Sequence, residues 1–586
     1  MTQFRTQPVL EIASETQCLE GWEAIASHLA HALSVTHKTV TVCVLELYHG
    51  VDADECAINL EAALHPAYVI RTEHLFKEES EIRQLVAPDV TDDRVFGHMT
   101  RLVIDDFLDP VKCAEARARI AALAHGLVLV IGMGASRIPH TTDMLIYGDM
   151  PRWEIQQRMR QGRIDNLGIR NRNEPDTMLL YKQCYFVDWR VCDRLKQELM
   201  ERWEYVLDTT QPNHPKLAAA AVIDSALRAA LTRPFSLVPF FDPGPWGGQW
   251  MKKVCGLDTS KENYAWCFNC VPEENSILFS INGIRIELPA LDLVFAHPRE
   301  LLGDAVYDRF GAEFPIRFDF LDTIGGGNLS LQVHPLTEYI RDKFGMAYTQ
   351  DESYYIVDAR AGATVYLGLR EGIDPGEMLA ALARAESGER AFDAERYVQS
   401  WPASAHDHFL IPAGTIHCSG RDCMVLEISA TPYIFTFKLW DWGRMGLDGR
   451  PRPIHIAHGR AVIQWDRSTS WIRDECVNRI ELLGTGDGWS EEKTGLHERE
   501  FIETRRHRFT KKVLHDTEGT VNVLCLVGGS EAVVESPRHA FDPFIVRYAE
   551  TFIVPAAVGP YTITPCGSSS ADNECVTIKA FVRSGQ

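Results

Sequence analysis

The sequence predicts a multidomain protein in which an α/β region with a parallel sheet precedes all-β regions. Three observations lead to this fold class. The chain of 586 residues is too long for a single hydrophobic core and suggests three or four domains. Its N-terminal part alternates apolar, β-branched runs with amphipathic segments, which is typical of strands and helices in turn. The remainder carries short β runs separated by glycine and proline, which favours antiparallel barrels or sandwiches.

The α/β region is expected to span residues 1–232. Strands are predicted in VTVCVLEL (residues 40–47) and GLVLVIGMGAS (126–136), and amphipathic helices within residues 109–126 and 189–207. Proline and glycine then become dense in LTRPFSLVPFFDPGPWGGQW, which indicates a domain boundary.

Two β regions are expected to follow, at residues 233–465 and 466–586. A helical insertion at residues 375–399 interrupts the first region. The second region loosely repeats the order of strands and turns of the first, which predicts another barrel of the same kind. The short β runs of the first region include NSILFSING (275–283), LSLQVHP (329–335), HFLIPAGTIH (408–417) and MVLEISA (424–430).

Composition excludes some partners. With 59 basic and 81 acidic residues the net charge is −22, which argues against a nucleic acid or an anionic membrane as partner. No apolar run approaches the roughly 20 residues of a membrane helix, and the N-terminus lacks the pattern of a secretory signal. The 15 cysteines are scattered, and Cys267 and Cys270 lack the second pair that a zinc knuckle needs. Reduced thiols in a cytoplasmic protein fit this pattern, and the oligomeric state stays open.

A candidate metal site begins in the run SLQVHP. Gln332 and His334 are two residues apart, so in a strand both side chains point to the same face, and Pro335 ends the pairing beyond them. Glu352 enters a later strand, and His417 follows a Pro-Ala-Gly turn. Two imidazoles, a carboxylate and an amide oxygen form a plausible ligand set for a divalent metal. A surface strand with a polar face shows the same alternation, so the run alone leaves both interpretations open.

The surrounding motifs occur in a recognisable order: GPWGG, LSLQVHP, an acidic residue before YYIVD, IPAGTIHCSG, VLEIS, and FKLWDWGR followed by RPIHI. Over residues 240–460 the chain resembles the zinc-dependent type I mannose-6-phosphate isomerase family, whose fold is a cupin, a double-stranded β-helix or jelly roll. The resemblance implies cupin domains at residues 233–465 and 466–586, and a zinc ion, with another divalent metal as the alternative. It assigns Gln332, His334, Glu352 and His417 to the metal, Arg444 and Glu427 to catalysis, and Lys438 and Ser330 to the substrate.

The implied reaction interconverts mannose 6-phosphate and fructose 6-phosphate through an enediol, for which a Lewis-acid metal, a cation and a proton carrier are suited. Two departures from the family pattern bear on this activity. Gln350 stands where the family has a lysine, and Lys438 stands where it has an arginine, which keeps the charge but loses the bidentate geometry. A catalytically impaired protein that binds a sugar phosphate, or regulates in response to one, is therefore the alternative.

The N-terminal region faintly resembles small-molecule P-loop kinases, including an arginine-bearing helix in the place of a lid. A working phosphate loop reads G-x-x-x-x-G-K-[ST], whereas the first strong strand here ends in ELYHGVDADEC, with Asp52, Asp54 and Glu55 as repelling charges. We therefore expect a degenerate domain without phosphoryl transfer, and a bifunctional kinase–isomerase is the less favoured hypothesis.

The second β region lacks a histidine after its Pro-Ala turn, where the first region has His417. His515 and His539 lie in polar segments that are predicted to be turns. We expect this region to be a metal-free barrel that supports the first one, with an unrelated β domain as the alternative.

Overall fold

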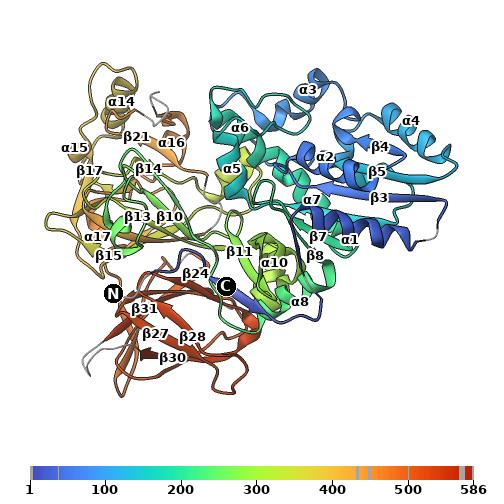
Figure 1. Cartoon of the computed structure of the whole chain (residues 1–586). Helices are drawn as coiled ribbons and strands as arrows, with labels where there is room; N and C mark the ends of the chain where they lie inside the picture. Colours follow the sequence, from blue (N-terminus) through green and yellow to red (C-terminus); the bar gives the residue numbers. More distant parts are fainter. Residues whose placement is uncertain are drawn as a thin grey trace. The chain divides into compact units, whose positions relative to one another are not determined.

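The computed structural model describes residues 4–16, 18–36, 38–430, 434–445, 452–498, 500–566 and 574–583. Contacts divide the chain into two units (Figure 1). The α/β unit comprises residues 9–229 and 276–296, and the β unit comprises residues 1–8, 230–275 and 297–586. The protein is multidomain and rich in sheet. In the described part of the chain, no helix combines the length and the apolar character that crossing a membrane requires.

A seven-stranded sheet forms the core of the α/β unit. Its strands are β2 (Leu19–Glu20), β3 (Val40–Leu47), β4 (Tyr68–Arg71), β5 (Gly126–Gly132), β6 (Met144–Asp149), β7 (Tyr205–Asp208) and β8 (Lys216–Ala219). They lie in the order β2-β8-β7-β6-β3-β5-β4, and the neighbours from β7 to β4 are parallel. The expected parallel α/β sheet is confirmed. β3 is buried along almost its whole length, because strands covered on both faces carry continuous apolar runs.

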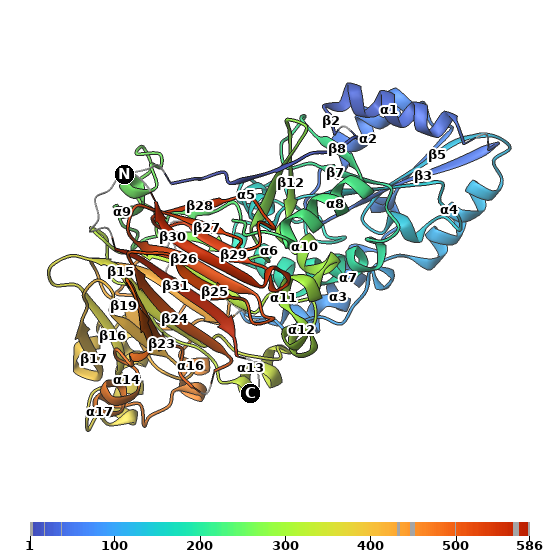
Figure 2. The same cartoon turned by 90° about the horizontal axis from the view of Figure 1, so that it is seen from below.

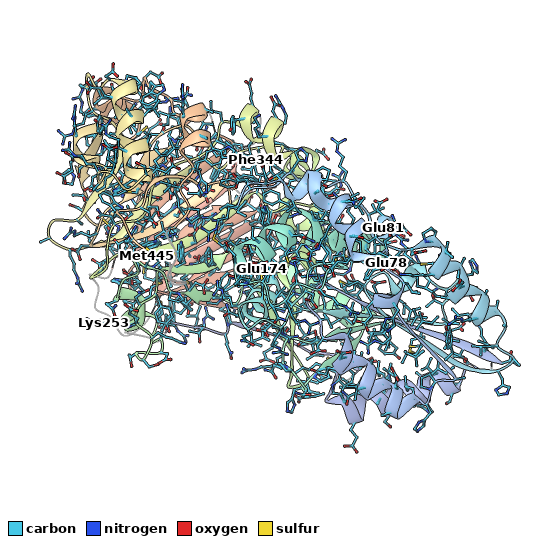
Figure 3. All side chains as sticks on the ribbon, turned by 90° about the horizontal axis from the view of Figure 1, so that it is seen from above. Glu78, Glu81, Glu174, Lys253, Phe344 and Met445 are labelled. Carbon is cyan, nitrogen blue, oxygen red and sulfur yellow. The ribbon has the colours of Figure 1, made fainter. Side chains whose placement is uncertain are left out.

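Helices alternate with these strands, and several of them begin at polar capping residues. The Asp52 carboxylate accepts hydrogen bonds from Asp54 N and Glu55 N, so the acidic segment after β3 starts a helix. At the next helix Glu81 accepts from the Glu78 backbone, and Figure 3 shows these two side chains together. The helices of this part are α1 (Trp22–Ser34), α2 (Ala53–Leu64), α3 (Glu79–Val90), α4 (Pro110–Ala121), α5 (Arg152–Arg160), α6 (Thr177–Gln183), α7 (Trp189–Leu199) and α8 (Ala220–Leu231). A π-helical turn, η4 (Cys184–Asp188), joins α6 to α7.

A later segment of the chain returns to the α/β unit. β1 (Val9–Ile12) pairs in parallel with β11 (Ser276–Ile281), which forms a hairpin with β12 (Ile284–Pro289) and leads to α10 (Ala290–Ala296). The hairpin turn is Asn-Gly, and both residues adopt the positive φ that such tight turns require. The run NSILFSING was expected in the first β region; its strand pairs instead with the chain's first strand.

Two antiparallel sheets build the first part of the β unit, as the short β runs predicted. The six-stranded sheet has the order β18-β15-β20-β13-β10-β9, and the five-stranded sheet the order β17-β16-β19-β14-β21. The strands of the first sheet are β9 (Phe240–Asp242), β10 (Trp266–Cys270), β13 (Ile316–Asp322), β15 (Glu352–Ala359), β18 (His408–Ile411) and β20 (Cys423–Ala430). Those of the second are β14 (Leu331–Val333), β16 (Thr364–Leu369), β17 (Val398–Pro402), β19 (His417–Ser419) and β21 (Phe437–Trp440).

The helical insertion lies where the amphipathic pattern predicted it. α14 (Pro375–Glu386) begins with a proline at its first turn and is capped by Asp374, whose carboxylate accepts from Glu377 N at 2.7 Å. α15 (Ala394–Tyr397) follows and leads directly into β17.

Two further antiparallel sheets follow in the chain, and Figure 2 shows several of their strands side by side. One sheet has the order β22-β23-β24-β31-β26-β29 and the other β25-β30-β27-β28. The first consists of β22 (Glu481–Gly486), β23 (Trp489–Gly495), β24 (Ile502–Phe509), β26 (Asn522–Gly528), β29 (Thr551–Val554) and β31 (Cys575–Val582). The second consists of β25 (Val513–Asp516), β27 (Glu531–Glu535), β28 (Phe544–Arg547) and β30 (Pro560–Cys566). Their inner faces share one apolar core that includes Phe509, Leu524, Val534 and Phe552.

The expectation of a turn at His515 is wrong. His515 lies in β25 and is buried against the Tyr561 ring, 5.1 Å away, while its neighbour Leu514 is exposed. Another buried histidine, His507 on β24, has its ring centroid 4.3 Å from that of His515. Polarity misled the prediction because this sheet turns an imidazole inward and a leucine outward. His539 lies outside the strands, in a turn closed by its N–H to Ser536 O.

Candidate metal centre

The predicted ligands come from both the six-stranded and the five-stranded sheet in the first part of the β unit. Gln332 on β14 is directly opposite His417 on β19, so these side chains share a face. His334 follows β14 immediately and lies on the same face as Gln332 by alternation. Glu352 opens β15 in the other sheet. The ligand set therefore lies between the two sheets.

The structure brings the two imidazoles and the carboxylate of the predicted set into contact range. Glu352 Oε2 is 3.1 Å from His334 Nε2, and Glu352 Oε1 is 2.8 Å from His417 Nε2. One ligand atom from each of these residues lies within 4.8 Å of the others, and all three side chains are completely buried. Burial opposes ionisation, but the two imidazoles hold the pKa of the Glu352 carboxyl well below its ordinary value.

Backbone carbonyls orient both imidazoles. His334 Nδ1 is 3.1 Å from Phe435 O, and His417 Nδ1 is 2.9 Å from Thr415 O. A carbonyl can only accept, so each Nδ1 carries a proton, and each ring turns its Nε2 toward the Glu352 carboxylate. A metal ion held here would take Nε2 of both histidines and an oxygen of Glu352 as ligands, with the Nδ1–H groups fixed by the backbone carbonyls. The residues present therefore fit a divalent metal ion.

Gln332 completes the set. Its amide nitrogen is 3.2 Å from His417 Nε2, and a half-turn of the amide places Oε1 there instead, which is the orientation a metal favours. Lys438 on β21 is opposite Gln332, so its side chain emerges on the same face of the sheet. Register thus places Lys438 beside the ligand set.

A buried charge network adjoins Glu352. Gln350 Nε2 donates to Glu352 Oε2 at 2.9 Å and to Glu427 Oε1 at 3.4 Å. Arg317 donates to Glu427 at 2.5 Å and to Asp319 at 2.9 Å. Burial and the neighbouring carboxylates raise the pKa of Glu427 well above its ordinary value, although Arg317 opposes this shift. Glu427 is therefore suited to hold a proton.

Arg444 is held by the loop that precedes β14. It donates to Asn328 O at 2.6 Å and to Asp441 Oδ1 at 2.5 Å. Ser330 Oγ donates to the same Asp441 oxygen at 3.0 Å. Because Ser330 alternates with Gln332, Asp441 links Arg444 to the strand that carries the ligands.

His455 has a different place. It precedes α16 (Ile456–Val462), its N–H donates to Lys438 O at 2.7 Å, and it is buried. The packing or substrate-adjacent role expected for His455 stays a prediction.

Several contributors were missed from the sequence. Arg317 and Asp319 shape the charges around the site, but each lies in a run where nothing in the local pattern marks it, and Asp441 lies in the motif DWGR without having been assigned a role. The carbonyls that orient the histidines carry no signal in side-chain identity at all, because any residue supplies one.

In the α/β unit, the glycine-rich turn after β5 is already occupied. Glu46 at the end of β3 accepts from Gly134 N at 2.6 Å and from Ser136 N at 2.8 Å. Burial raises the pKa of Glu46 to about 7. The amides that a phosphate loop would offer to a nucleotide are thus bonded to the protein's own carboxyl group.

Comparison with known proteins gives a family match for the N-terminal part of the chain and separate matches to individual proteins. A family described as a domain of unknown function (DUF8485) matches residues 21–232, which is less than half of the chain. This description gives the predicted kinase likeness no support, and that likeness stays a prediction.

Similar sequences are mannose-6-phosphate isomerases. The enzyme of Streptococcus mutans is 30% identical over 220 residues, which cover 37% of this chain and 64% of that protein. ManA of Bacillus subtilis is 27% identical over 233 residues, which cover 40% of this chain and 69% of that protein. The match to the streptococcal protein thus spans under two thirds of its length.

Solved structures described as mannose-6-phosphate isomerases are also similar to this chain. The mannose 6-phosphate isomerase of Bacillus subtilis matches with a TM-score of 0.48 at 18% identity, covering 59% of this chain and 99% of that one. A mannosephosphate isomerase described as putative, from Archaeoglobus fulgidus, matches with a TM-score of 0.43 at 15% identity, covering 60% of this chain and 98% of that one. Both scores lie below 0.5, so these similarities do not by themselves establish a shared fold.

Proposed function

We propose that the protein is a divalent-metal-dependent aldose–ketose isomerase, with zinc as the ion, that interconverts mannose 6-phosphate and fructose 6-phosphate. One observation carries this proposal: the Nε2 atoms of His334 and His417 converge on the buried Glu352 carboxylate. The names of the similar sequences support the sugar phosphate as substrate.

Gln332, His334, Glu352 and His417 would hold the ion. When bound, an ion of this kind supplies Lewis acidity that polarises the sugar's oxygens and stabilises the charge of an enediolate. Imidazole and carboxylate donors suit zinc among the common divalent ions.

The protein's own residues supply the remaining chemistry. The isomerisation moves a proton between C2 and C1 of the sugar, and a carboxyl group with a raised pKa, such as Glu427, can hold and transfer that proton. Arg444 and Lys438 provide cations for the phosphate or for the developing enediolate charge. Ser330 positions Arg444 through their shared Asp441 carboxylate.

A coupled assay with both sugar phosphates on zinc-loaded protein tests the activity. We expect His334→Ala and His417→Ala each to lose one metal equivalent and to reduce turnover at least about a hundredfold, because each removes a donor from a buried site. Metal content is measured by elemental mass spectrometry beside the assay.

Two control variants separate ligands from neighbours. His455→Ala is expected to retain the metal. Arg444→Lys is expected to retain the metal and lower the rate, because an ammonium keeps the charge but loses the fork that binds Asn328 and Asp441. Absence of turnover in metal-loaded wild-type protein, or full metal occupancy in the His334 variant, would refute the assignment.

The second candidate is a protein that binds a sugar phosphate without converting it. Gln350 favours it, since a neutral amide occupies the place of the family lysine and bonds both Glu352 and Glu427. Calorimetry that shows tight binding of mannose 6-phosphate together with absent turnover would select this function.

A kinase activity of the α/β unit is the least favoured possibility, because Glu46 occupies the glycine-rich turn. ATP binding by the full chain, measured by calorimetry, would revive it. The proposed role of the α/β unit is therefore structural or regulatory.

We also place the protein in a reducing compartment, the cytoplasm. All fifteen cysteines are free thiols and all but Cys566 are buried, which supports this placement. No nucleic acid or membrane partner is proposed, in line with the net charge of −22.

A further inference from the structure

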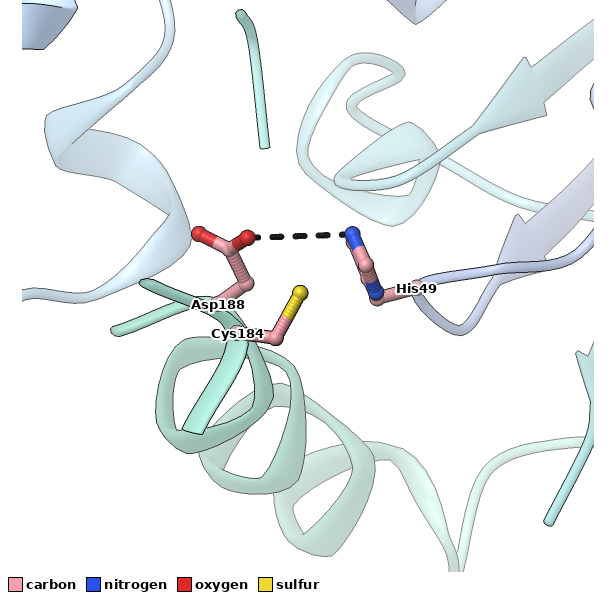
Figure 4. Close-up of side chains that lie close together, drawn as sticks. All are labelled: His49, Cys184 and Asp188. Atoms are coloured by element: carbon pink, nitrogen blue, oxygen red, sulfur yellow. Dashed lines mark ion pairs between the residues drawn. The ribbon is translucent and has the colours of Figure 1, made fainter. Parts of the chain in front are cut away.

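A second buried group of metal-ligand type lies in the α/β unit, apart from the centre just described. It consists of His49, Cys184 and Asp188, and one ligand atom from each lies within 4.8 Å of the others. All three are buried, with exposed fractions of 1% or less. Figure 4 shows the Cys184 sulfur lying between the Asp188 carboxylate and the His49 ring.

The group lies at a place where α/β sheets commonly bind ligands. His49 follows the carboxyl end of β3, which has β5 on one side and β6 on the other. The chain leaves β3 toward β4 on one side and later crosses to β6 on the other, so this end of β3 is the switch point of the sheet. Cys184 and Asp188 are the first and last residues of the π-helical turn η4, and such turns are frequent at functional sites.

The surroundings of His49 resemble those of a histidine ligand. Its Nε2 is 2.9 Å from Asp165 O, which can only accept, so Nε2 carries the proton and Nδ1 keeps a free lone pair. Within the described chain, buried Nδ1 has no hydrogen-bond partner. A backbone carbonyl that holds one imidazole N–H and thereby leaves the other nitrogen free is the usual support of a metal-bound histidine.

The other two donors are supported in the same manner. Asn166 Nδ2 donates to Asp188 Oδ2 at 2.7 Å and to Cys184 Sγ at 3.1 Å, and Leu167 N donates to Asp188 Oδ2 at 3.2 Å. Such N–H groups favour a thiolate and a carboxylate and fix their direction, although burial and the Asp188 carboxylate raise the pKa of the Cys184 thiol well above its ordinary value. His49 Nε2, which donates to Asp165 O, lies 3.7 Å from Asp188 Oδ2, beyond hydrogen-bond range, so His49 and Asp188 are not bonded to each other directly.

We propose that His49, Cys184 and Asp188 bind a divalent transition-metal ion of the zinc class as a structural site of the α/β unit. Nitrogen, thiolate sulfur and carboxylate oxygen are donors that zinc accepts, and all three donors are buried. Zinc bond lengths place tetrahedral donors about 3.3 to 3.6 Å apart, so binding requires an inward shift of about 1 Å at most. Binding exchanges the thiol proton of Cys184 for the ion, and water or a protein oxygen takes the fourth position.

Cobalt(II) added to metal-free full-length protein tests the site, because it binds where zinc does and its spectrum reports the donors. A thiolate ligand gives an intense near-ultraviolet charge-transfer band, whereas nitrogen and oxygen ligands give only weak visible bands. The isomerase centre has no sulfur donor, so the intense band reports the Cys184 site alone. We expect this band in the wild-type protein, removed by added zinc.

Variants assign the band. Cys184→Ser is expected to lose it completely and to bind one ion fewer, and His49→Gln to weaken cobalt binding at this site at least about tenfold. Cys56→Ser is the matched control, since Cys56 is a buried thiol of the same unit outside the group. His334→Ala is expected to keep the band while losing the other ion, which separates this site from the proposed isomerase centre. Circular dichroism verifies the fold of each variant.

Two results would overturn the proposal. One is cobalt-loaded wild-type protein without the intense band, a measurement that no folding defect of a variant can affect. The other is a band that survives in folded Cys184→Ser protein.

Discussion

Backbone carbonyls set the chemistry of three histidines in this chain. Phe435 O and Thr415 O hold Nδ1 of His334 and His417, whereas Asp165 O holds Nε2 of His49. In His334 and His417 the opposite nitrogen faces the buried Glu352 carboxylate, and in His49 it has no hydrogen-bond partner within the described chain. The identity of a histidine in the sequence does not reveal which nitrogen is free; the fold does.

Gln350 is the residue at which a substitution tests the proposed isomerase activity most directly. Gln350→Lys is expected to raise kcat/KM for mannose 6-phosphate about tenfold, or about 1.4 kcal/mol of barrier, because it adds a cation where the reaction develops negative charge. Steady-state kinetics with verified metal content measure this effect.

Gln350→Met provides the comparison, since it has similar volume but donates nothing to Glu352 and Glu427. It is expected to lower the rate. A Lys variant that is no faster than wild type while retaining its metal would show that the amide already serves the site, and that the missing lysine explains no loss.

At the scale of elements, the strand pair β24–β31 places two like charges opposite each other, one of them buried, which lowers the stability of the fold. Lys579 on β31 is directly opposite Arg505, so two like charges face each other inside a sandwich. Arg505 is paired with Glu491 at 3.0 Å and Glu503 at 2.6 Å, but no carboxylate of the described chain lies within 4.0 Å of the Lys579 ammonium. Burial, with Arg505 opposite, lowers the pKa of Lys579 from 10.5 to about 8.

This shift destabilises the fold below pH 8. Between pH 8 and 10.5 the unfolded chain binds more protons than the folded one, so the free energy of unfolding rises with pH across that window. Lys579→Met is expected to stabilise the protein at pH 7 by about 1 to 3 kcal/mol and to flatten this rise. Urea unfolding at pH 7 and pH 10 measures both effects.

The exposed Lys511, which pairs with Asp487, is the matched control, and Lys511→Met should change stability by less than about 0.5 kcal/mol. A destabilised Lys579 variant would contradict the account and would indicate that the ammonium has a favourable partner.

At the scale of the molecule, sequence order and structural units do not coincide. Residues 1–8 belong to the β unit, where Arg5 pairs with Glu550 at 2.6 Å, and residues 276–296 belong to the α/β unit. The chain therefore passes between the units at several points, and a cut near residue 232 separates no independent module. The three-domain division expected from composition stays a prediction.

A chain that begins at residue 230 tests this organisation. It leaves β11, β12 and α10 without β1 and β7, exposing Ile277, Phe279, Ile286 and Leu288, which are completely buried in the intact chain. We expect such a chain to aggregate, because it exposes a contiguous apolar surface. Size-exclusion chromatography measures the outcome.

Replacing residues 276–296 of the shortened chain by a glycine-serine linker of the same length should restore a single monodisperse species. Equal behaviour of the two shortened chains would contradict the assignment of this segment to the α/β unit.

Much of the fold class was readable from local patterns. Continuous apolar runs alternating with amphipathic segments predicted the parallel sheet, Asp374 and Pro375 marked the start of the helical insertion, and short runs with turns predicted the antiparallel sheets. Local patterns failed at His515, since which face of a strand turns inward depends on what packs against it.

By itself the sequence determined the candidate donors of the metal centre, because alternation in Gln332 and His334 and the motifs around Glu352 and His417 are local properties of the chain. Only the tertiary structure decided that these donors converge, since β14, β15 and β19 meet through pairing between distant segments. It alone also brought His49 to Cys184 and Asp188, and β1 to β11. Contacts between residues far apart in sequence follow from how whole faces bury their apolar area, and no local pattern encodes that choice.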